Sequence, residues 1–388
     1  MERIAAKLSA ALIFLSAVSA GYAQEQPAFS TEGWWKAAEP PFSPVVNDDS
    51  TITFRLKAPA AREVVLLFDE WDVLEIPMQK DEQGVWSVTV GPVVPRLYQY
   101  KFMADGTETF DTANTSVKVG TMIYGNFVDV PDRLNPRFDE IRHAGGGEIH
   151  SHTYCSSSLG TRRSMCVYVP RAAVEHPDCQ FPVLYLRHGG GDNERSWTVD
   201  GRAAAILDNL IADGDAVPMY VVMTYGLTDG SWAGGSTPEG IAALEHELLA
   251  DVIPFIERRY NVIAAKCSRA IAGLSMGGGQ AFVIGLRNLD KFCAVGDFSA
   301  GILSDGRFDY ERYMPGVMQH PDRINHELSL LWLSCGTKDP RYQGHLHTAE
   351  DLRSRGIEIE FHEGPWGHEW QFWREQLHDF AIRLFKNQ

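Results

Sequence analysis

The pentapeptide Gly273-Leu-Ser-Met-Gly277 constrains the fold more than any other segment of the chain. It follows the apolar residues 270–272 and precedes a helix-compatible segment that starts at Gln280. A serine between two such segments lies on a tight strand-to-helix turn, where flanking glycines let the backbone approach itself closely. The motif therefore predicts a buried strand followed directly by a helix.

Segments around this motif alternate between strand and helix patterns. Apolar strand-like runs occupy residues 182–186, 219–223, 270–274, 328–333 and 358–362, and helix-like segments occupy 203–211, 241–260, 280–288, 347–355 and 370–385. Such alternation is typical of a mostly parallel sheet with helices on both faces. We therefore expect one α/β domain over residues 148–388.

Residues 41–130 show a different pattern. Short alternating runs, such as Thr51-Ile-Thr-Phe-Arg-Leu56 and Val85-Trp-Ser-Val-Thr-Val90, are separated by turn residues. This spacing predicts an immunoglobulin-like β-sandwich. Residues 131–147 contain two prolines and three consecutive glycines, and we interpret them as a linker.

The first residues have the order of a secretory signal. A basic start precedes an apolar stretch over residues 8–20, and small residues follow at 21–23. The apolar stretch is too short for a membrane span, so residues 1–23 predict a cleaved signal peptide and a secreted or periplasmic protein. We expect no membrane association after cleavage, and a polar arm over residues 24–40.

Charge and cysteine content exclude some classes of function. The net charge is −16 and no Lys/Arg cluster occurs, so we expect no nucleic-acid partner. The six cysteines form no Cys-x-x-Cys pair, and neither a metal site nor a cofactor is expected. Cys267 and Cys293 each precede a predicted strand and could form a disulfide, although the sequence leaves the pairing open.

The serine of the pentapeptide predicts nucleophilic chemistry. A serine hydroxyl needs a base to remove its proton, and in this fold class the chain order is serine, acid, histidine. Asp339 follows the strand at 328–334, and His368 lies in a glycine-rich loop before the last helix. We therefore predict a Ser275–His368–Asp339 triad, with Glu350, Asp351 and Asp297 as alternative acids.

Further side chains are candidates for the substrate pocket. The loop His188-Gly-Gly-Gly191 follows a strand and can turn a backbone N–H toward a developing oxyanion, with the N–H of Met276 as a second donor. Trp232 and Trp366 lie on predicted loops near the site. We interpret Trp370 and Trp373 as core residues. We interpret the two histidines of His345-x-His347 as solvated.

The segments around these residues resemble carbohydrate esterase family 1, which includes feruloyl and acetyl xylan esterases. The likeness runs from about residue 147 to the end of the chain. It is carried by Leu186-Arg-His-Gly-Gly-Gly-Asp-Asn-Glu-Arg-Ser-Trp197, Arg269-Ala-Ile-Ala-Gly-Leu-Ser-Met-Gly-Gly278, Leu333-Ser-Cys-Gly-Thr-Lys-Asp339 and Gly367-His-Glu-Trp-Gln-Phe-Trp373. Residues 41–130 resemble carbohydrate-binding family 48 through Thr53-Phe-Arg-Leu-Lys-Ala-Pro59 and Asp81-Glu-Gln-Gly-Val-Trp-Ser-Val-Thr-Val-Gly-Pro92.

This resemblance implies an α/β-hydrolase fold with the same triad, and it assigns the oxyanion donors to Met276 and Gly190. Arg187 and Tyr225 depart from the family pattern. The leading hypothesis is release of ferulate from arabinoxylan. The alternatives are an acetyl xylan esterase, a siderophore esterase of the enterochelin type, and a catalytically inactive carbohydrate-binding protein. The expected partners are feruloylated or acetylated xylan and xylo-oligosaccharides.

Overall fold

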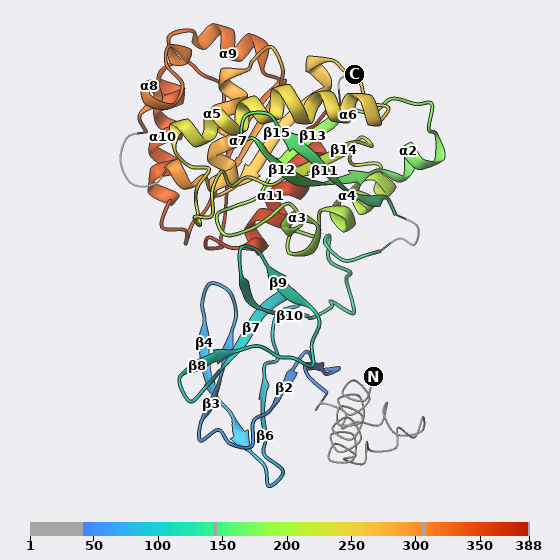
Figure 1. The fold of residues 1–388 in the computed structure, drawn as a ribbon, viewed down its shortest axis with the longest axis vertical. Helices are drawn as coiled ribbons and strands as arrows, with labels where there is room; N and C mark the ends of the chain where they lie inside the picture. Colours follow the sequence, from blue (N-terminus) through green and yellow to red (C-terminus); the bar gives the residue numbers. More distant parts are fainter. Residues whose placement is uncertain (1–41, 143–145, 304–307, 387–388) are drawn as a thin grey trace, which may run out of the picture. The chain divides into compact units, whose positions relative to one another are not determined.

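The computed structural model describes residues 42–142, 146–303 and 308–386. By its internal contacts the chain divides into two units, of which the second, Ser43–Gln388, is compact. The predicted signal peptide and the predicted arm lie outside the described residues and stay predictions. All the strands and helices that the structure describes belong to the second unit (Figure 1).

Two antiparallel sheets at the start of this unit share one apolar core. Their strand orders are β1-β2-β6-β5 and β4-β3-β7-β10-β9, with β8 paired to β7. Ile52 and Phe54 of one sheet and Tyr100 and Phe102 of the other are at most 1% exposed. Alternate residues of β2 and β7 thus face the core, as the sequence pattern predicts. The strands are β1 (Val45–Val46), β2 (Ile52–Lys57), β3 (Val64–Phe68), β4 (Leu74–Pro77), β5 (Gln79–Lys80), β6 (Val85–Val90), β7 (Leu97–Ala104), β8 (Thr107–Thr109), β9 (Val117–Val119) and β10 (Ile123–Asp129).

A mixed sheet with the order β11-β12-β14-β13-β15-β16-β17-β18 follows. The pairs β11–β12 and β12–β14 are antiparallel, and the neighbours from β14 to β18 are parallel. The sheet therefore carries an antiparallel edge on a parallel body. Its strands are β11 (Glu148–Ser156), β12 (Thr161–Val169), β13 (Val183–Arg187), β14 (Tyr220–Thr224), β15 (Arg269–Leu274), β16 (Ala294–Phe298), β17 (Leu330–Gly336) and β18 (Glu360–Gly364).

Helices cover both faces of this sheet (Figure 1). Val183 and Tyr185 of β13 belong to one core, which α5 and α7 cover, whereas Leu184 and Leu186 belong to the opposite core under α4 and α11. Burial on both faces explains why the strands lack alternation in sequence. The α-helices are α2 (Arg171–Glu175), α3 (Ser196–Val199), α4 (Ala203–Asp213), α5 (Pro238–Glu247), α6 (Ile253–Arg259), α7 (Met276–Arg287), α8 (Tyr310–Tyr313), α9 (Pro321–Glu327), α10 (Tyr342–Ser354) and α11 (Trp370–Arg383). No helix within the described ranges has the length and apolar character of a membrane span.

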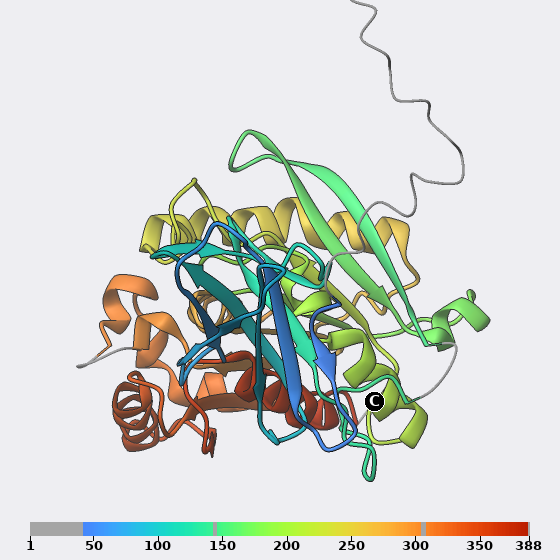
Figure 2. The same cartoon turned by 90° about the horizontal axis from the view of Figure 1, so that it is seen from below.

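The hairpin β11–β12 is an element that the sequence analysis did not predict. It extends beside α5 and α6 in Figure 2, and most residues of β11 keep some exposure. A strand with little buried surface carries a weak apolar pattern, which explains the omission of β11; β12 is buried over most of its length and was missed as well. The helix predicted over residues 241–260 is interrupted by a π-helical turn at Leu248–Val252, directly before Pro254 near the start of α6. Proline supplies no N–H for the regular helical bond at that point.

The disulfide that the sequence left open between Cys267 and Cys293 is not formed in the structure, where the Cys293 Sγ–H donates to the backbone oxygen of Cys267 at 2.9 Å. The prediction of a solvated His345 is wrong. His345 is fully buried rather than solvated, because α10 begins at Tyr342 and turns this side chain toward the sheet. There its Nε2 lies 3.4 Å from Oδ2 of the buried Asp297 on β16.

Candidate active site

Ser275 occupies the turn between β15 and α7 in a strained backbone conformation, with φ 51° and ψ −117°. Its N–H donates to the carbonyl of Phe298, and its own carbonyl accepts from the N–H groups of Gly279 and Gly301. A Cβ at Gly277 would lie 2.4 Å from the carbonyl oxygen of His188. The glycine is therefore required by close backbone approach, and it allows the serine to project from the end of the strand.

The structure brings the three residues predicted for the triad together. His368 Nε2 lies 2.9 Å from Ser275 Oγ, and His368 Nδ1 lies 2.6 Å from Asp339 Oδ2. Asp339 follows β17, and His368 lies between β18 and α11. All three side chains thus come from the carboxyl-terminal edge of the parallel strands. These distances allow a proton to pass from the serine hydroxyl to the imidazole.

Burial and charge set the protonation of this group. Burial lowers the pKa of His368 below its usual range, against the opposing effect of the Asp339 carboxylate. Burial alone would raise the pKa of Asp339, but the hydrogen bond from His368, its charge and Arg341 lower it overall. At neutral pH the histidine is therefore neutral and the aspartate charged. In that state Nδ1–H donates to Asp339, and Nε2 is free to accept the proton of Ser275.

The two residues predicted to supply the oxyanion donors lie near Ser275: Met276 follows it directly, and Gly190 lines the same cavity. Met276 is the first residue of α7, and Gly190 lies in the loop after β13; within the described ranges neither N–H has a hydrogen-bond acceptor. The N–H of Gly191, in contrast, donates to the carbonyl of Trp232 at 2.8 Å. Donors without an acceptor at a helix N-terminus are the groups that can hold a developing oxyanion.

The side chain of His188 fixes this loop. Its Nδ1 bonds to the carbonyl of Gly189 at 2.8 Å, and its Nε2 accepts from the N–H of Gly226 at 2.7 Å. Burial lowers the pKa of His188 to about 3, so the ring is neutral and Nδ1 carries the proton. Arg187, which departs from the family pattern, is also buried and donates to Gln280 and Thr224. The ring of Tyr225 contacts that of His188 at a tilt of 38°, with centroids 5.6 Å apart.

A cavity of about 160 Å³ opens over Ser275 and His368. Trp232 lines it, as predicted, whereas Trp366 does not and instead donates its Nε1–H to Glu375 at 2.8 Å. Trp370 and Trp373 are buried, as expected for core residues, but they also line the cavity. The whole lining is Glu70, Lys118, Tyr124, Gly189, Gly190, Asp192, Trp232, Leu274, Ser275, His368, Trp370 and Trp373.

Sequence reasoning missed the three lining residues that come from the sandwich, Glu70, Lys118 and Tyr124. Lys118 stands between two valines on β9, a pattern that predicts a solvent-facing lysine on an edge strand. No local signal indicated that these side chains lie beside a serine more than 150 residues further along the chain.

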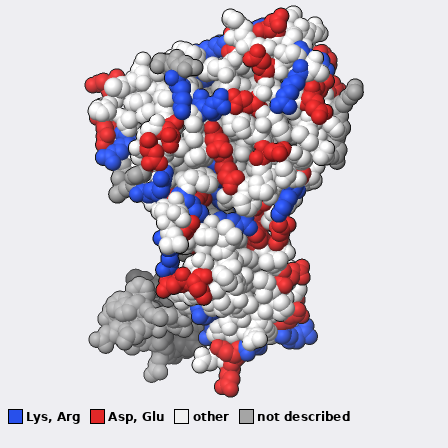
Figure 3. Space-filling model, turned by 180° about the vertical axis from the view of Figure 1, so that it is seen from behind, with Lys and Arg blue, Asp and Glu red and all other residues white. Residues whose placement is uncertain are grey.

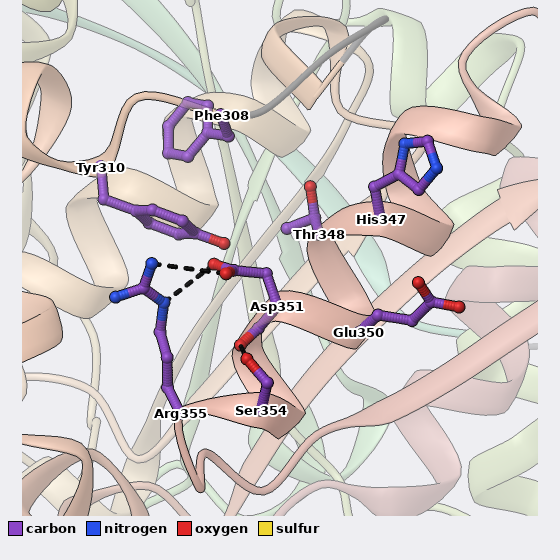
Figure 4. A pocket seen from close by; sticks show the side chains of 8 residues that line it. All are labelled: Phe308, Tyr310, His347, Thr348, Glu350, Asp351, Ser354 and Arg355. Carbon is purple, nitrogen blue, oxygen red and sulfur yellow. Dashed lines mark hydrogen bonds and ion pairs between the residues drawn. The ribbon is translucent and has the colours of Figure 1, made fainter.

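The alternative acids lie elsewhere. Glu350 and Asp351 project from α10 into a separate cavity of about 560 Å³, where Asp351 pairs with Arg355 at 2.8 Å (Figure 4). Asp297 pairs with His345. The carboxylate that bonds to His368 belongs to Asp339.

Residues 156–384, more than half of the chain, match the family model described as "Putative esterase". The chain belongs to this esterase family. Residues 41–119 of the esterase also match the model described as "Carbohydrate-binding module 48 (Isoamylase N-terminal domain)". Both resemblances seen in the sequence are thereby confirmed.

The esterase is 32% identical over 349 residues to an endo-1,4-beta-xylanase/feruloyl esterase of Xylanibacter ruminicola, in an alignment that covers 88% of this chain and 46% of that protein. It is 29% identical over 155 residues to endo-1,4-beta-xylanase Y of Acetivibrio thermocellus, covering 37% of this chain and 13% of that protein. The esterase thus spans less than half the length of these two curated relatives.

Solved structures of esterases also resemble this chain. A ferulic acid esterase superposes with a TM-score of 0.54 at 26% identity, over 61% of this chain and 97% of that one. The enterochelin esterase of Shigella flexneri superposes with a TM-score of 0.65 at 16% identity, over 92% of this chain and 98% of that one. The second likeness concerns the fold alone. Together with the family match, these relatives make the chain a carboxylic ester hydrolase.

Proposed function

We propose that the esterase hydrolyses hydroxycinnamoyl esters, chiefly feruloyl esters carried by plant cell-wall arabinoxylan. The observation that carries this proposal is the hydrogen-bonded chain from Ser275 through His368 to Asp339 beneath a cavity lined by aromatic rings. The relative from Xylanibacter ruminicola, whose name includes feruloyl esterase activity, supports the substrate class. An extracellular or periplasmic location would suit a polysaccharide substrate, and the predicted signal peptide supports it.

In the proposed mechanism, Ser275 Oγ attacks the ester carbonyl while His368 Nε2 takes its proton. The carbonyl oxygen becomes an oxyanion, which the N–H groups of Met276 and Gly190 stabilise. Asp339 stabilises the imidazolium. Collapse of the intermediate breaks the ester bond, and His368 gives the proton to the departing alcohol. Water then attacks the acyl-enzyme by the same steps and releases the carboxylic acid.

Two alternatives from the same chemistry remain as proposals of second rank. An acetyl xylan esterase would use the same triad with a smaller acyl group. A siderophore esterase draws support from the enterochelin esterase likeness, which extends over 92% of the chain and so includes the sandwich. A catalytically inactive carbohydrate-binding protein is disfavoured, because the triad distances are those of a competent site.

A substrate comparison tests this proposal. The values of kcat/KM for methyl ferulate, acetylated xylan and a catecholate ester are measured with the unmodified chain and with Ser275→Ala. We expect ferulate to exceed acetyl by about tenfold or more, since about 1.4 kcal/mol of ring burial suffices for that factor. Ser275→Ala should lose roughly 10⁴-fold or more on every ester. A higher rate on acetylated xylan would overturn the feruloyl assignment, and a folded, active Ser275→Ala variant would overturn the mechanism.

A further inference from the structure

The cavity over Ser275 has a wall that comes from the sandwich. Residues 43–388 form one compact unit, and within it Glu70, Lys118 and Tyr124 line the same cavity as Ser275 and His368. Glu70 follows β3, Lys118 lies on β9, and Tyr124 lies on β10. The sandwich therefore contributes directly to the space where the proposed function requires the acyl group to bind.

Hydrogen bonds hold this wall to the two loops that carry the site. The N–H of Thr121 donates to the carbonyl of Gly191 at 2.7 Å, and the side chain of Asn193 donates to the carbonyl of Val119 at 2.9 Å. On the histidine side, Arg96 pairs with Glu369 at 3.1 Å. The wall is thus fixed to the loop of Gly190 and to the loop of His368 alike.

Lys118 places a positive charge at this wall. Its Nζ lies 2.7 Å from Glu70 Oε1, and only 12% of its side chain is exposed. Burial disfavours the charged lysine, but Glu70, Asp192 and Asp200 outweigh this and raise its pKa. An ammonium has three N–H donors, and within the described ranges Glu70 is its one hydrogen-bond partner. Donors remain available for an oxygen atom of a ligand.

Aromatic rings line the cavity that Lys118 and Ser275 share. Trp232, Trp370, Trp373 and Tyr124 all line the cavity. The Tyr124 hydroxyl lies 3.0 Å from Thr121 Oγ1 and 3.3 Å from the carbonyl of Gly191, which fixes the ring in place. A cavity of about 160 Å³ with such walls fits one flat aromatic ring better than a stretch of polysaccharide.

We propose that the sandwich supplies the subsite for the ring end of the acyl group. In this subsite Lys118 donates a hydrogen bond to the oxygen substituents of a hydroxycinnamoyl ring, Glu70 accepts from its phenolic hydroxyl, and Tyr124 packs against the ring. This inference rests on the proposed function and deepens it, because it makes the N-terminal module a determinant of acyl specificity.

The test uses the full chain and methyl esters, which carry no sugar. The ratio of kcat/KM for methyl ferulate to that for methyl cinnamate, whose ring bears no oxygen, is measured for the unmodified enzyme, Lys118→Met and Lys118→Met/Glu70→Gln. The double variant avoids leaving a buried carboxylate without its partner. We expect both variants to lower the ratio by about tenfold, the loss of one hydrogen bond from a charged donor. The matched control is Lys101→Met, on β7 of the same module with Glu108 as its surface partner, which should keep the original ratio.

The outcomes separate the two proposals. An unmodified enzyme without turnover of methyl ferulate would overturn the proposed function and this inference with it. Good turnover combined with an unchanged ratio in both Lys118 variants would overturn the inference alone. Equal losses on ferulate and cinnamate would likewise overturn it, because they would show that Lys118 only supports the fold.

Discussion

Ser275 is held where an L-residue is strained, and the surrounding backbone compensates for the strain. A non-glycine residue in such a region of φ and ψ costs about 1–3 kcal/mol. Three backbone hydrogen bonds, from Ser275 to Phe298 and to Ser275 from Gly279 and Gly301, hold the turn in this state. The strain belongs to the backbone and not to the hydroxyl, so it persists when the side chain is changed.

This difference can be measured with two inactive variants. Ser275→Gly and Ser275→Ala both lack the nucleophile, but only glycine adopts a positive φ without steric cost. We expect Ser275→Gly to have the higher melting temperature by roughly 2 °C, which corresponds to about 1 kcal/mol for a protein of this size. Thermal unfolding followed by circular dichroism measures it. An alanine variant that is equally or more stable would show that the turn carries no strain.

The pH dependence of activity follows from His368. Its neutral form is the base, and burial lowers its pKa below the usual value of about 6.5. Activity should therefore be complete above pH 6.5 and fall only as the pH drops through the lowered pKa. A profile of kcat/KM from acidic to neutral pH measures the midpoint.

Asp339→Asn should reduce kcat by about 10⁴-fold. It should also move the acidic limb of the profile to still lower pH, since Asp339 raises the pKa of His368. A midpoint above 6.5 in the unmodified enzyme would contradict this assignment.

At the scale of elements, a buried charged pair connects β16 with α10 behind the triad. Asp297 and His345 are both fully buried, 3.4 Å apart. Asp297 Oδ1 also accepts from the N–H of Ala300 at 2.8 Å, next to the Gly301 that bonds to Ser275. Burial opposes the charge on His345, but Asp297 outweighs it and raises the pKa of His345 well above its usual range. The pair therefore connects the turn of Ser275 with the helix that follows Asp339.

Replacing one member of this pair should lower the free energy of unfolding more than replacing both. Asp297→Asn keeps the acceptor for Ala300 but leaves His345 buried without a counter-charge, and we expect a loss of about 3–5 kcal/mol. Asp297→Asn/His345→Gln should recover part of that loss. Because the folded pKa of His345 is raised, its contribution is complete below about pH 6.5 and disappears as the pH rises through the raised value. Urea unfolding at pH 6 and at pH 9 tests both points, and equal stabilities of the single and double variants would refute the pairing.

The sequence predicted where a site residue lies when a strand and the loop that follows it are both recognisable from their own residues. Ser275, Asp339 and His368 each follow the carboxyl end of a strand of the parallel sheet, and parallel strands bring such ends to one edge, so their meeting could be predicted. The mostly exposed strand β11 lacked a strong apolar pattern. Lys118 was beyond local reasoning, because it lies against Glu70 and against loop and helix residues far along the chain.

At the scale of the whole molecule, ion pairs fix part of the segment 131–147, which was expected to be a linker. Asp139 is 1% exposed and lies 3.1 Å from Nε of the equally buried Arg374 on α11. Arg137 pairs with Asp139 and with Asp129 at the end of β10. Prolines and glycines suggest a flexible connection in sequence, but these ion pairs connect residues 137–139 to strand β10 and to helix α11. On the face drawn in Figure 3, acidic and basic side chains are interspersed, in line with a partner other than a polyanion.

The exposure of aromatic rings in the N-terminal module bears on how the esterase would bind xylan. Between residues 43 and 130, all of which are described, every aromatic ring is buried or only partly exposed, and Tyr124 faces the cavity rather than the outer surface. A sugar ring packs most favourably on an exposed aromatic face, and among the aromatic side chains of the described residues 42–130 only Phe42, at the start of the module, is exposed, to 79%. The module is then expected to act through the cavity wall and not as an independent anchor.

Retention on insoluble xylan separates these roles. The full chain with Ser275→Ala, which cannot release the ester, is mixed with feruloylated arabinoxylan and with the same material after alkaline removal of its esters. If the module acts only through the cavity wall, retention should be weak on the de-esterified polymer and stronger on the feruloylated one, because binding then requires the acyl group. Lys118→Met in the same background should lower the difference, whereas Lys101→Met should not. Strong and equal retention on both polymers would instead identify a carbohydrate-binding surface that does not depend on the cavity of Ser275.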